Sequence, residues 1–297
     1  MQYKSFCGII IIRIFILRKN IAFVAKYRVY TAKNAVNHNK ERQPHMKIIS
    51  LANQKGGVGK TTSCVNIAAS LGVLGHRVLI IDLDPQGNTT SGVGITKRGL
   101  KGTTKELLNG EMDIHDIIRE TPYQNLWVIP ANTTLTSSEF ELFDFDDSEY
   151  RMKKALDLVK DDFDYVLIDC PPSLGRLTVN ALTASDGVIV PMQCEFYALE
   201  GLSQLMITVR LIQKNYNPKL NISGILVTMY NGRLLLSMQV INELKKHYED
   251  KLFETKISRN VRLSEAPSFG KPVYYHDKNS KGAKEYLEVA NEIVSRL

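Results

Sequence analysis

The sequence predicts an α/β protein in which a mostly parallel, doubly wound sheet carries helices on both faces. Short apolar segments rich in Val, Ile and Leu alternate with amphipathic segments of helical period. A glycine-rich stretch separates the first strand from the first helix, and carboxylates end two later strands. Apolar strands joined through helices are typical of parallel sheets that are buried on both sides.

Strands and helices are expected in alternation after Met46. The expected strands are residues 47–52, 77–83, 126–130, 165–169, 187–191, 222–228 and 252–257. The expected helices are residues 61–74, 150–160, 199–214, 236–247 and 283–297. The last helix has an apolar stripe, which favours packing on the domain over membrane binding. Because the sequence contains no internal repeat and no low-complexity linker, residues 46–297 are interpreted as one domain.

The composition is typical of a globular protein in a reducing compartment. Of the 297 residues, 44% are hydrophobic, which suffices for a sizeable core. The cysteines Cys7, Cys64, Cys170 and Cys194 form no CxxC pair and lack metal-ligand spacing. We therefore expect a cytoplasmic protein without a disulfide framework. Cys64 and Cys170 are expected to be buried small residues, and Trp127 to belong to the core.

The net charge of +7 is concentrated at the N-terminus. Residues 1–45 hold nine Lys/Arg and one acid, a net charge of +8, which leaves −1 for the rest of the chain. An apolar run over 7–17 is too short for a spanning helix, which needs about 20 residues. We interpret residues 1–45 as a disordered extension or a mis-assigned start, with a membrane or nucleic-acid tether as the alternative. Any DNA-binding surface on the body must be a local patch.

The segment NQKGGVGKTT, residues 53–62, carries the predicted chemistry. Glycines let backbone N–H groups turn toward phosphate oxygens, and the following helix N-terminus adds its positive dipole. Lys60 is placed to reach the β- and γ-phosphates of ATP, and Thr61 to ligate Mg²⁺. The segment departs from the GxxxxGK[ST] pattern, because Gln54 holds the first glycine position and an extra lysine, Lys55, follows it.

Carboxylates at two strand ends complete the predicted site. Asp82 and Asp84 end the second strand in IDLDPQGN, and Asp169 ends another strand in YVLIDCPP. The carboxyl ends of parallel strands face the ligand crevice of such sheets. Asp169 is predicted to hold Mg²⁺ through water, as a Walker B carboxylate does. A single Asp at a strand end is often only a turn residue, but two such strands after a phosphate loop favour function.

Five segments, KGGVGKTT, DLDPQGN, DCPPSLG, EFYALEG and RNVRLSEAPSFGKP, together closely resemble the ParA/Soj family of partition ATPases. The resemblance runs from Met46 to the C-terminus and places the chain among P-loop NTPases of the deviant Walker A type. It implies hydrolysis of ATP to ADP and phosphate with Mg²⁺, in an ATP-sandwich homodimer. It also implies nonspecific binding of double-stranded DNA, a ParB-type partner and nucleoid association, without stable membrane association.

The resemblance assigns roles to single residues. Lys55 looks like the signature lysine, which reaches across the dimer to the partner's phosphates. Asp84 resembles the switch aspartate that positions the attacking water, and Asp82 is implied to support the metal or the switch. Arg233 and Arg262 match arginines that contact DNA phosphates without sequence readout.

The implied sites fall into three groups. The catalytic residues are Lys55, Lys60 and Asp84. The metal ligands are Thr61, Asp169 and Asp82. The ATP-binding residues are Lys55, Gly56, Gly57, Val58, Gly59, Lys60, Thr61, Thr62, Ser258 and Asn260. Ser258 stands where the family usually has proline, in the loop that contacts adenine.

Three alternatives remain at the level of sequence. A MinD-like positioning ATPase should carry a basic amphipathic helix after the domain, whereas this sequence ends at Ser295-Arg296-Leu297. A redox ATPase like the nitrogenase iron protein needs cluster-ligating cysteines in a glycine-flanked context, which the sequence does not offer. A nucleotide-gated regulator of replication initiation or transcription is not separable from a partition ATPase by sequence. The cargo, chromosome or plasmid, also stays open, although no N-terminal helix-turn-helix pattern is present.

Overall fold

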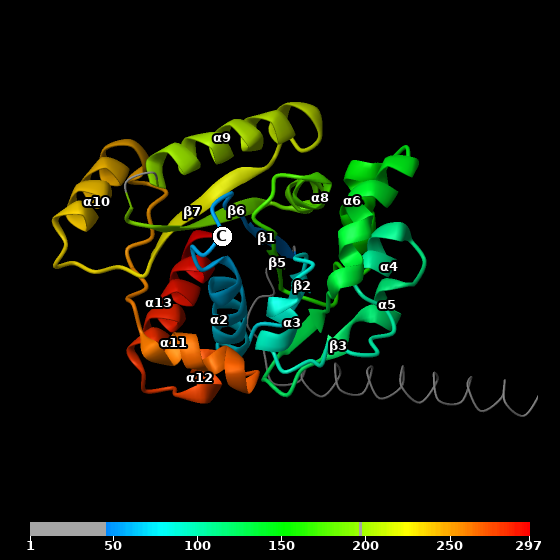
Figure 1. Ribbon diagram of the computed structural model, residues 1–297, viewed down its shortest axis with the longest axis horizontal. Coiled ribbons are helices and arrows are strands. Elements are labelled where there is room, and N and C mark those ends of the chain that lie inside the picture. Colours follow the sequence, from blue (N-terminus) through cyan, green and yellow to red (C-terminus); the bar gives the residue numbers. More distant parts are fainter. Residues whose placement is uncertain (1–45, 196–197) are drawn as a thin grey trace, which may run out of the picture. The chain divides into compact units, whose positions relative to one another are not determined.

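The computed structural model describes residues 46–195 and 198–297 (Figure 1). The extension predicted over residues 1–45 lies outside the described residues. In the described part, seven strands form one sheet in the order β3-β4-β2-β5-β1-β6-β7. All neighbouring strands pair in parallel except β3 and β4, which are antiparallel. The predicted α/β fold with a mostly parallel sheet is therefore confirmed.

The element bounds agree with the predicted alternation over most of the chain. The strands are β1 Lys47–Leu51, β2 Val78–Asp82, β3 Arg119–Glu120, β4 Leu126–Ile129, β5 Tyr165–Asp169, β6 Gly187–Gln193 and β7 Asn221–Thr228. The α-helices are α2 Lys60–Val73, α3 Asn88–Gly92, α4 Thr104–Asn109, α5 Ile114–Ile117, α6 Ser138–Glu141, α7 Arg151–Asp157, α8 Arg176–Ala184, α9 Ala198–Asn215, α10 Leu235–Tyr248, α11 Val261–Glu265, α12 Val273–His276 and α13 Lys281–Arg296. Short 3₁₀ helices are η1 Thr133–Ser137, η2 Leu142–Asp144, η3 Ser148–Tyr150 and η4 Ala266–Phe269.

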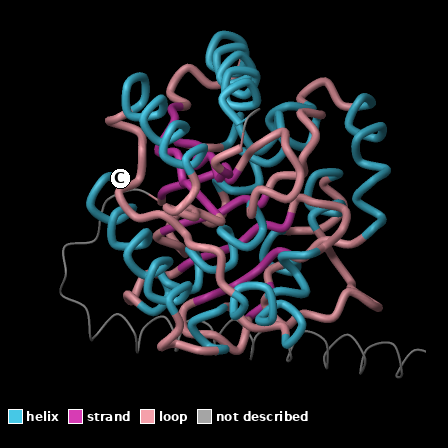
Figure 2. Tube along the Cα trace, turned by 60° about the vertical axis from the view of Figure 1, so that its left-hand side comes forward, coloured by secondary structure: helices cyan, strands magenta, loops and turns pink. Residues whose placement is uncertain are grey.

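Helices bury both faces of the sheet. Successive side chains of a strand point to opposite faces, so each strand contributes to two cores. In β2, Leu79 and Ile81 pack into a core with side chains of α4, α7, α8, α9 and α10. Val78 and Ile80 of the same strand pack into a second core with α2 and α13. Figure 2 shows the strands between these layers of helices. Trp127 is buried in the first core, as predicted.

The C-terminal helix α13 packs its apolar stripe on the domain, as predicted. Tyr286, Ala290 and Ile293 are buried in the core that α13 shares with α2. The Tyr286 hydroxyl and the Ser63 hydroxyl lie 3.0 Å apart and share a hydrogen bond. Of the helices in the described part of the chain, none is long and apolar enough to cross a membrane.

The strand expected over residues 252–257 is wrong. Leu252 forms only an isolated bridge with Ile225 of β7. The backbone N–H groups of Glu254 and Thr255 donate instead to the Glu292 carboxylate of α13, at 2.9 Å each. Because that carboxylate takes these two donors, the pairing with β7 is interrupted at Glu254 and Thr255, and it resumes where the Ile257 N–H donates to the Val227 carbonyl at 2.9 Å.

The prediction also missed several short elements, of which α8 and β3 are the clearest. The sequence of α8, RLTVNALTA, spans only nine residues and contains the β-branched residues Thr178, Val179 and Thr183, which lower its helix propensity. Strand β3 has two residues and lies at the sheet edge. Cys64 and Cys170 are buried, as predicted.

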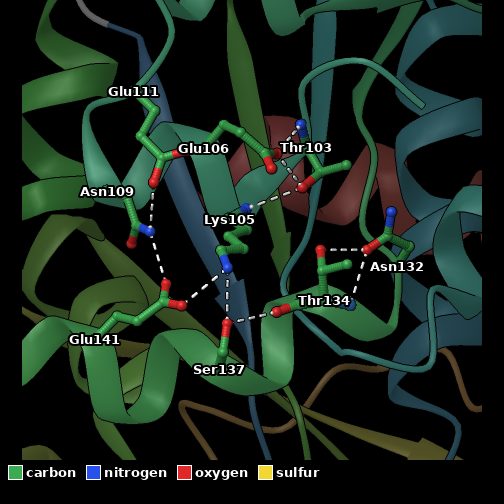
Figure 3. A network of polar contacts seen from close by, with 9 residues as sticks. All are labelled: Thr103, Lys105, Glu106, Asn109, Glu111, Asn132, Thr134, Ser137 and Glu141. Carbon is green, nitrogen blue, oxygen red and sulfur yellow. Dashed lines mark hydrogen bonds and ion pairs between the residues drawn. The ribbon is translucent and has the colours of Figure 1, made fainter. Parts of the chain in front are cut away.

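A polar network joins α4 to α6 at the surface (Figure 3). Thr103 and Glu106 form a capping box, in which the Thr103 N–H donates to the Glu106 carboxylate at 2.7 Å. Lys105 Nζ donates to Glu141 Oε1 at 2.9 Å, and Asn109 Nδ2 donates to Glu141 Oε2 at 2.7 Å. The hydrogen bonds from Asn109 and Lys105 lower the pKa of Glu141 to about 2.

Candidate nucleotide site

The loop between β1 and α2 is a backbone cradle at a helix N-terminus. Gly57 and Gly59 have φ angles of 73° and 86°, in the left-handed region that strains residues with a Cβ. Gly59 is the N-cap of α2, which begins at Lys60. A Cβ built on Gly56 or Gly57 would meet no atom within 4 Å, so the space in front of the loop is open. This arrangement suits phosphate, because N–H groups and the helix dipole converge on the same space.

Lys60 is a nearly buried cation inside this loop. Lys60 is 7% exposed, and its Nζ donates a hydrogen bond to the Lys55 carbonyl at 3.2 Å. Burial lowers the pKa of the Lys60 ammonium, while the nearby charges of Asp169 and Asp84 raise it. An anion at the loop would therefore stabilise the charged form of Lys60.

Asp169 ends β5 directly behind the loop and is fully buried. Its Oδ2 accepts hydrogen bonds from the hydroxyls of Thr61 and Thr89, each at 2.8 Å. Its Oδ1 is buried without a hydrogen-bond partner in the described part of the chain. Burial and the nearby Asp82 charge raise the pKa of Asp169 to about 7, against the hydrogen bonds from the two threonines. A buried carboxylate in this state suits a cation at the loop.

Asp82 and Asp84 shape the loop that follows β2. The Asp82 Oδ2 accepts from the backbone N–H and hydroxyl of Thr90, at 2.7 and 2.6 Å, and Oδ1 accepts from the Asp84 N–H at 3.2 Å. Burial raises the pKa of Asp82 to about 6. Asp84 is only partly buried, and its Oδ1 accepts from the Gln86 N–H at 2.9 Å. Asp82 therefore fixes the loop, whereas Asp84 lies at its accessible edge.

Lys55 lies at the outer side of the phosphate loop. Its side chain is 41% exposed and forms an ion pair with Glu195, which follows β6. Gln193 Nε2, at the end of the same strand, donates to the Gly57 carbonyl at 2.7 Å. The two predicted lysines thus occupy different environments, one inside the loop and one outside it.

Ser258 and Asn260, the residues predicted to contact adenine, form hydrogen bonds with other residues of the chain. The N–H and hydroxyl of Ser258 donate to the Glu285 carboxylate at 2.9 and 2.7 Å. Asn260 is the N-cap of α11, and its Oδ1 accepts from the Arg262 N–H at 2.8 Å. Their contact with adenine remains a prediction.

The two predicted DNA-contacting arginines are both exposed, but their environments differ. The Arg233 backbone N–H donates to Asn231 Oδ1 at 3.1 Å in the turn before α10. The Arg262 guanidinium lies 2.8 Å from a Glu265 carboxylate oxygen and 3.4 Å from an Asp277 carboxylate oxygen. The hydrogen bond that the Arg262 guanidinium donates to Glu265 raises the pKa of Arg262.

Sequence reasoning missed five polar residues that hold the parts of the site together. They are Thr89, Thr90, Gln193, Glu195 and Thr228. Thr89 and Thr90 directly follow the DLDPQGN segment, and Glu195 opens EFYALEG, so a signal existed for these three. Gln193 and Thr228 are single polar residues at strand ends, and no pattern in the sequence marks either of them.

The parallel sheet, the glycine loop before α2 and the Thr61–Asp169 contact define a P-loop nucleotide-binding protein. Comparison with known proteins gives the same class. A family model described as an AAA domain matches residues 46–222.

Relatives and solved structures narrow this class. The chain is 54% identical to the sporulation initiation inhibitor protein Soj of Bacillus subtilis, over 84% of this chain and 98% of that protein. It is 48% identical to the chromosome-partitioning ATPase Soj of Treponema pallidum, over 84% and 98% of the two chains. A structure of cobyrinic acid a,c-diamide synthase from Mycobacterium smegmatis with bound ATP analog and magnesium is 37% identical, with a TM-score of 0.74 over 84% and 94% of the two chains. The chain belongs to the ParA/Soj family of chromosome-partitioning ATPases.

Proposed function

We propose that this chain is an ATP-driven switch that forms a sandwich dimer and partitions chromosomes or plasmids with a ParB-type partner. The position of Lys55 carries the proposal. Lys60 is 7% exposed inside the loop and serves the loop's own phosphates, whereas the Lys55 side chain is 41% exposed outside it. Lys55, outside the loop, would bind the phosphates held by a second subunit. Membership of the ParA/Soj family supports this role.

The residues of the site fit ATP with Mg²⁺. The Thr61 hydroxyl lies 2.8 Å from Asp169 Oδ2, and Asp169 Oδ1 is buried without a partner among the described residues. These are oxygen ligands of the kind that Mg²⁺ takes directly or through water. When bound, Mg²⁺ neutralises charge on the transferred phosphoryl group. The chain's own contribution at the β- and γ-phosphates is the Lys60 ammonium and the loop N–H groups.

Asp84 is the proposed residue for the attacking water. The Gly87 N–H donates to the Asp84 carbonyl at 2.8 Å, and this turn begins two residues after Asp82, which pairs with Asp169 at the ends of β2 and β5. A carboxylate there orients the water and accepts its hydrogen bond. Lys55 of a second subunit would stabilise the negative charge that develops on the phosphates.

The dimer is tested with Lys55→Ala, against Lys153→Ala as an exposed lysine control on α7. Lys55→Ala should bind ATP normally, because Lys60 still serves the loop. It should fail to dimerise with ATP in analytical ultracentrifugation and should not hydrolyse ATP. Normal dimerisation and turnover of Lys55→Ala would contradict the sandwich.

DNA binding is proposed to belong to the ATP dimer and to a local patch. The chain outside residues 1–45 has a net charge near −1, so a single copy has little overall attraction for DNA. Two copies of Arg233 and Arg262 on one dimer surface would multiply the phosphate contacts. The ion pairs of Arg262 with Glu265 and Asp277 are exposed and therefore weak, so a phosphate backbone displaces them. Such a protein would reside in the cytoplasm on the nucleoid.

Filter or anisotropy assays with ATP and with ADP test this proposal. Binding should require ATP, ignore sequence and weaken steeply with salt. Arg233→Ala and Arg262→Ala should each weaken it and leave dimerisation intact, whereas Arg210→Ala on α9 should not. A protein that begins at Met46 removes the +8 charge of residues 1–45. Equal DNA binding by that protein with ADP and ATP would rule out the gated switch.

A further inference from the structure

Thr228 joins the phosphate loop to β7, the last strand in the sheet order. It is the last residue of β7 and is 2% exposed. Its hydroxyl donates to the Val58 carbonyl at 2.7 Å, and the Met192 carbonyl is a second, more distant acceptor at 3.2 Å. Its methyl carbon lies 3.6 Å from the position that a Cβ on Gly59 would take. Thr228 therefore binds Val58 and lies beside the α-carbon side of Gly59, from a strand that is not adjacent to β1.

The Val58 carbonyl accepts the hydrogen bond of Thr228 and shares a peptide plane with the Gly59 N–H. Its orientation therefore follows that of the N–H. The peptide unit is rigid, so rotation of that N–H toward a phosphate also rotates the carbonyl. A hydrogen bond from Thr228 to this carbonyl would therefore be sensitive to whether phosphate occupies the loop. The dipole at the N-terminus of α2, where Gly59 is the N-cap, favours that occupation.

The residues after Thr228 link this contact to both arginine segments. Met229 has a φ of 49°, a left-handed conformation that is unfavourable for a residue with a Cβ. The Tyr230 N–H donates to the Ile257 carbonyl at 2.9 Å, and Tyr230 forms a parallel bridge with Ser258. Arg233 lies three residues beyond Tyr230, and Arg262 lies four residues beyond Ser258.

We propose that Thr228 is a positioning residue that transmits phosphate-loop occupation to residues 229–236 and 258–262. This inference rests on the proposed nucleotide site, and it deepens the proposed function by naming the link between ATP and the two arginines. The strained Met229 conformation is held by the contacts on either side of it, at Thr228 and Tyr230. A shift at Thr228 is therefore passed to Tyr230 and through its bridge to Ser258, instead of being absorbed by a flexible turn.

Two substitutions separate the hydroxyl from simple packing. Thr228→Val keeps the shape and removes the hydrogen bond to the Val58 carbonyl. Thr228→Ser keeps the hydroxyl and removes the methyl group near Gly59. If Thr228 only fills space, Thr228→Val should be harmless and Thr228→Ser should be the damaging change. If Thr228→Val does not fold, Thr228→Ala removes the hydroxyl without adding bulk.

The test is hydrogen exchange of the full chain with and without Mg²⁺ and a non-hydrolysable ATP analogue. In the unaltered protein, the analogue should change exchange in peptides covering 53–62, 229–236 and 258–262. The two distant segments should change by about fivefold or more, the factor equivalent to one hydrogen bond of about 1 kcal/mol. Thr228→Val should keep the change at 53–62 and lose it in the two distant segments, while Thr228→Ser should retain all three.

The outcomes are distinguishable. A response at 229–236 and 258–262 that survives in Thr228→Val overturns the inference, as does protection of 53–62 alone in the unaltered protein. No response at 53–62 would overturn the nucleotide site and this inference together. If all three segments respond through Thr228 but DNA binding is indifferent to ATP, the inference holds and the DNA part of the proposed function fails.

Discussion

Two polar regions of this molecule have opposite electrostatic character. At the ends of β2 and β5, burial raises the pKa of Asp82 to about 6 and that of Asp169 to about 7. In the network between α4 and α6, hydrogen bonds from Asn109 and Lys105 lower the pKa of Glu141 to about 2. In the first region, burial destabilises the charged carboxylates. In the second, hydrogen bonds from other residues of the chain stabilise the charged carboxylate.

The difference indicates which region awaits a ligand. Both regions contain a buried oxygen without a hydrogen-bond partner among the described residues, Asp169 Oδ1 in the first and Asn109 Oδ1 in the second, so this feature alone does not separate them. A carboxylate perturbed by burial beside an accessible loop is typical of a functional site. The α4–α6 network shows the same residue types in a purely structural role, because its carboxylate receives donors from Lys105 and Asn109.

The largest difference in ATP affinity is expected between the variants Lys60→Ala and Lys105→Ala. Lys60→Ala should abolish tight ATP binding, because the phosphates lose the cation buried in the loop. Leaving a buried charge without its partner typically costs about 3–5 kcal/mol, or at least about 100-fold in affinity. Lys105→Ala removes a lysine of the α4–α6 network and should leave ATP affinity unchanged. Isothermal titration of both variants measures this contrast, and equal ATP affinity in the two would place the phosphates elsewhere.

Asp84→Ala tests the catalytic part of the nucleotide region without removing its binding part. ATP binding should persist, because Asp84 lies at the edge of the loop that Asp82 fixes. Hydrolysis should fall by about 10²–10⁴-fold, as expected when a water-orienting carboxylate is lost. Phosphate-release kinetics measure the rate, and gel filtration with ATP should show that the dimer accumulates. A normal turnover rate would remove Asp84 from the mechanism.

Sequence alone predicted the phosphate loop and its carboxylates because their signals are local. The NQKGGVGKTT segment and the strands ending in Asp82 and Asp169 each lie in one short stretch. The contacts of Glu195 with Lys55 and of Thr228 with Val58 were not predictable in this way. They form only because β6 and β7 follow β1 in the sheet order, and that order depends on packing of the whole chain.

The missed break in the segment 252–257 has a similar cause. Its apolar pattern fits a strand, and it does run beside β7 at Ile225. The Glu292 carboxylate that takes two of its backbone donors comes from α13, about 40 positions later in the chain. Local periodicity contains no information on such a distant competitor for backbone hydrogen bonds.

Asp169→Asn tests the cost of the buried charge. The folded pKa of about 7 exceeds the ordinary value of 3.8, so the native state binds this proton more tightly than the unfolded state. Stability from this group is therefore present below pH 4 and lost as pH rises toward 7. Asp169→Asn, neutral throughout, should be more stable without nucleotide at pH 8 by about 1–3 kcal/mol, and the gain should shrink toward pH 5.

Urea unfolding at the two pH values measures this difference. The carbonyl of the asparagine can still accept hydrogen bonds from Thr61 and Thr89, so the packing of the site is preserved. With Mg²⁺ and ATP the order should reverse, because the unaltered protein gains the metal contact and Asp169→Asn does not. Lower stability of Asp169→Asn at pH 8 without nucleotide would show that the charge is already balanced.

The smallest effect, with the opposite sign, is expected for Glu141→Gln in the α4–α6 network. The pKa of Glu141 is lowered to about 2, so its contribution is present above pH 4.5 and lost as pH falls toward 2. Its side chain is 36% exposed, so solvent screening limits the loss to about 0.5 kcal/mol at pH 7. Urea unfolding should show this loss at pH 7, a smaller one at pH 3 and a smaller one in 1 M salt. ATP hydrolysis should be unchanged. If Glu141→Gln instead stabilised the protein, or altered ATP affinity, the surface network would resemble the nucleotide region, and burial would no longer explain why their carboxylates differ.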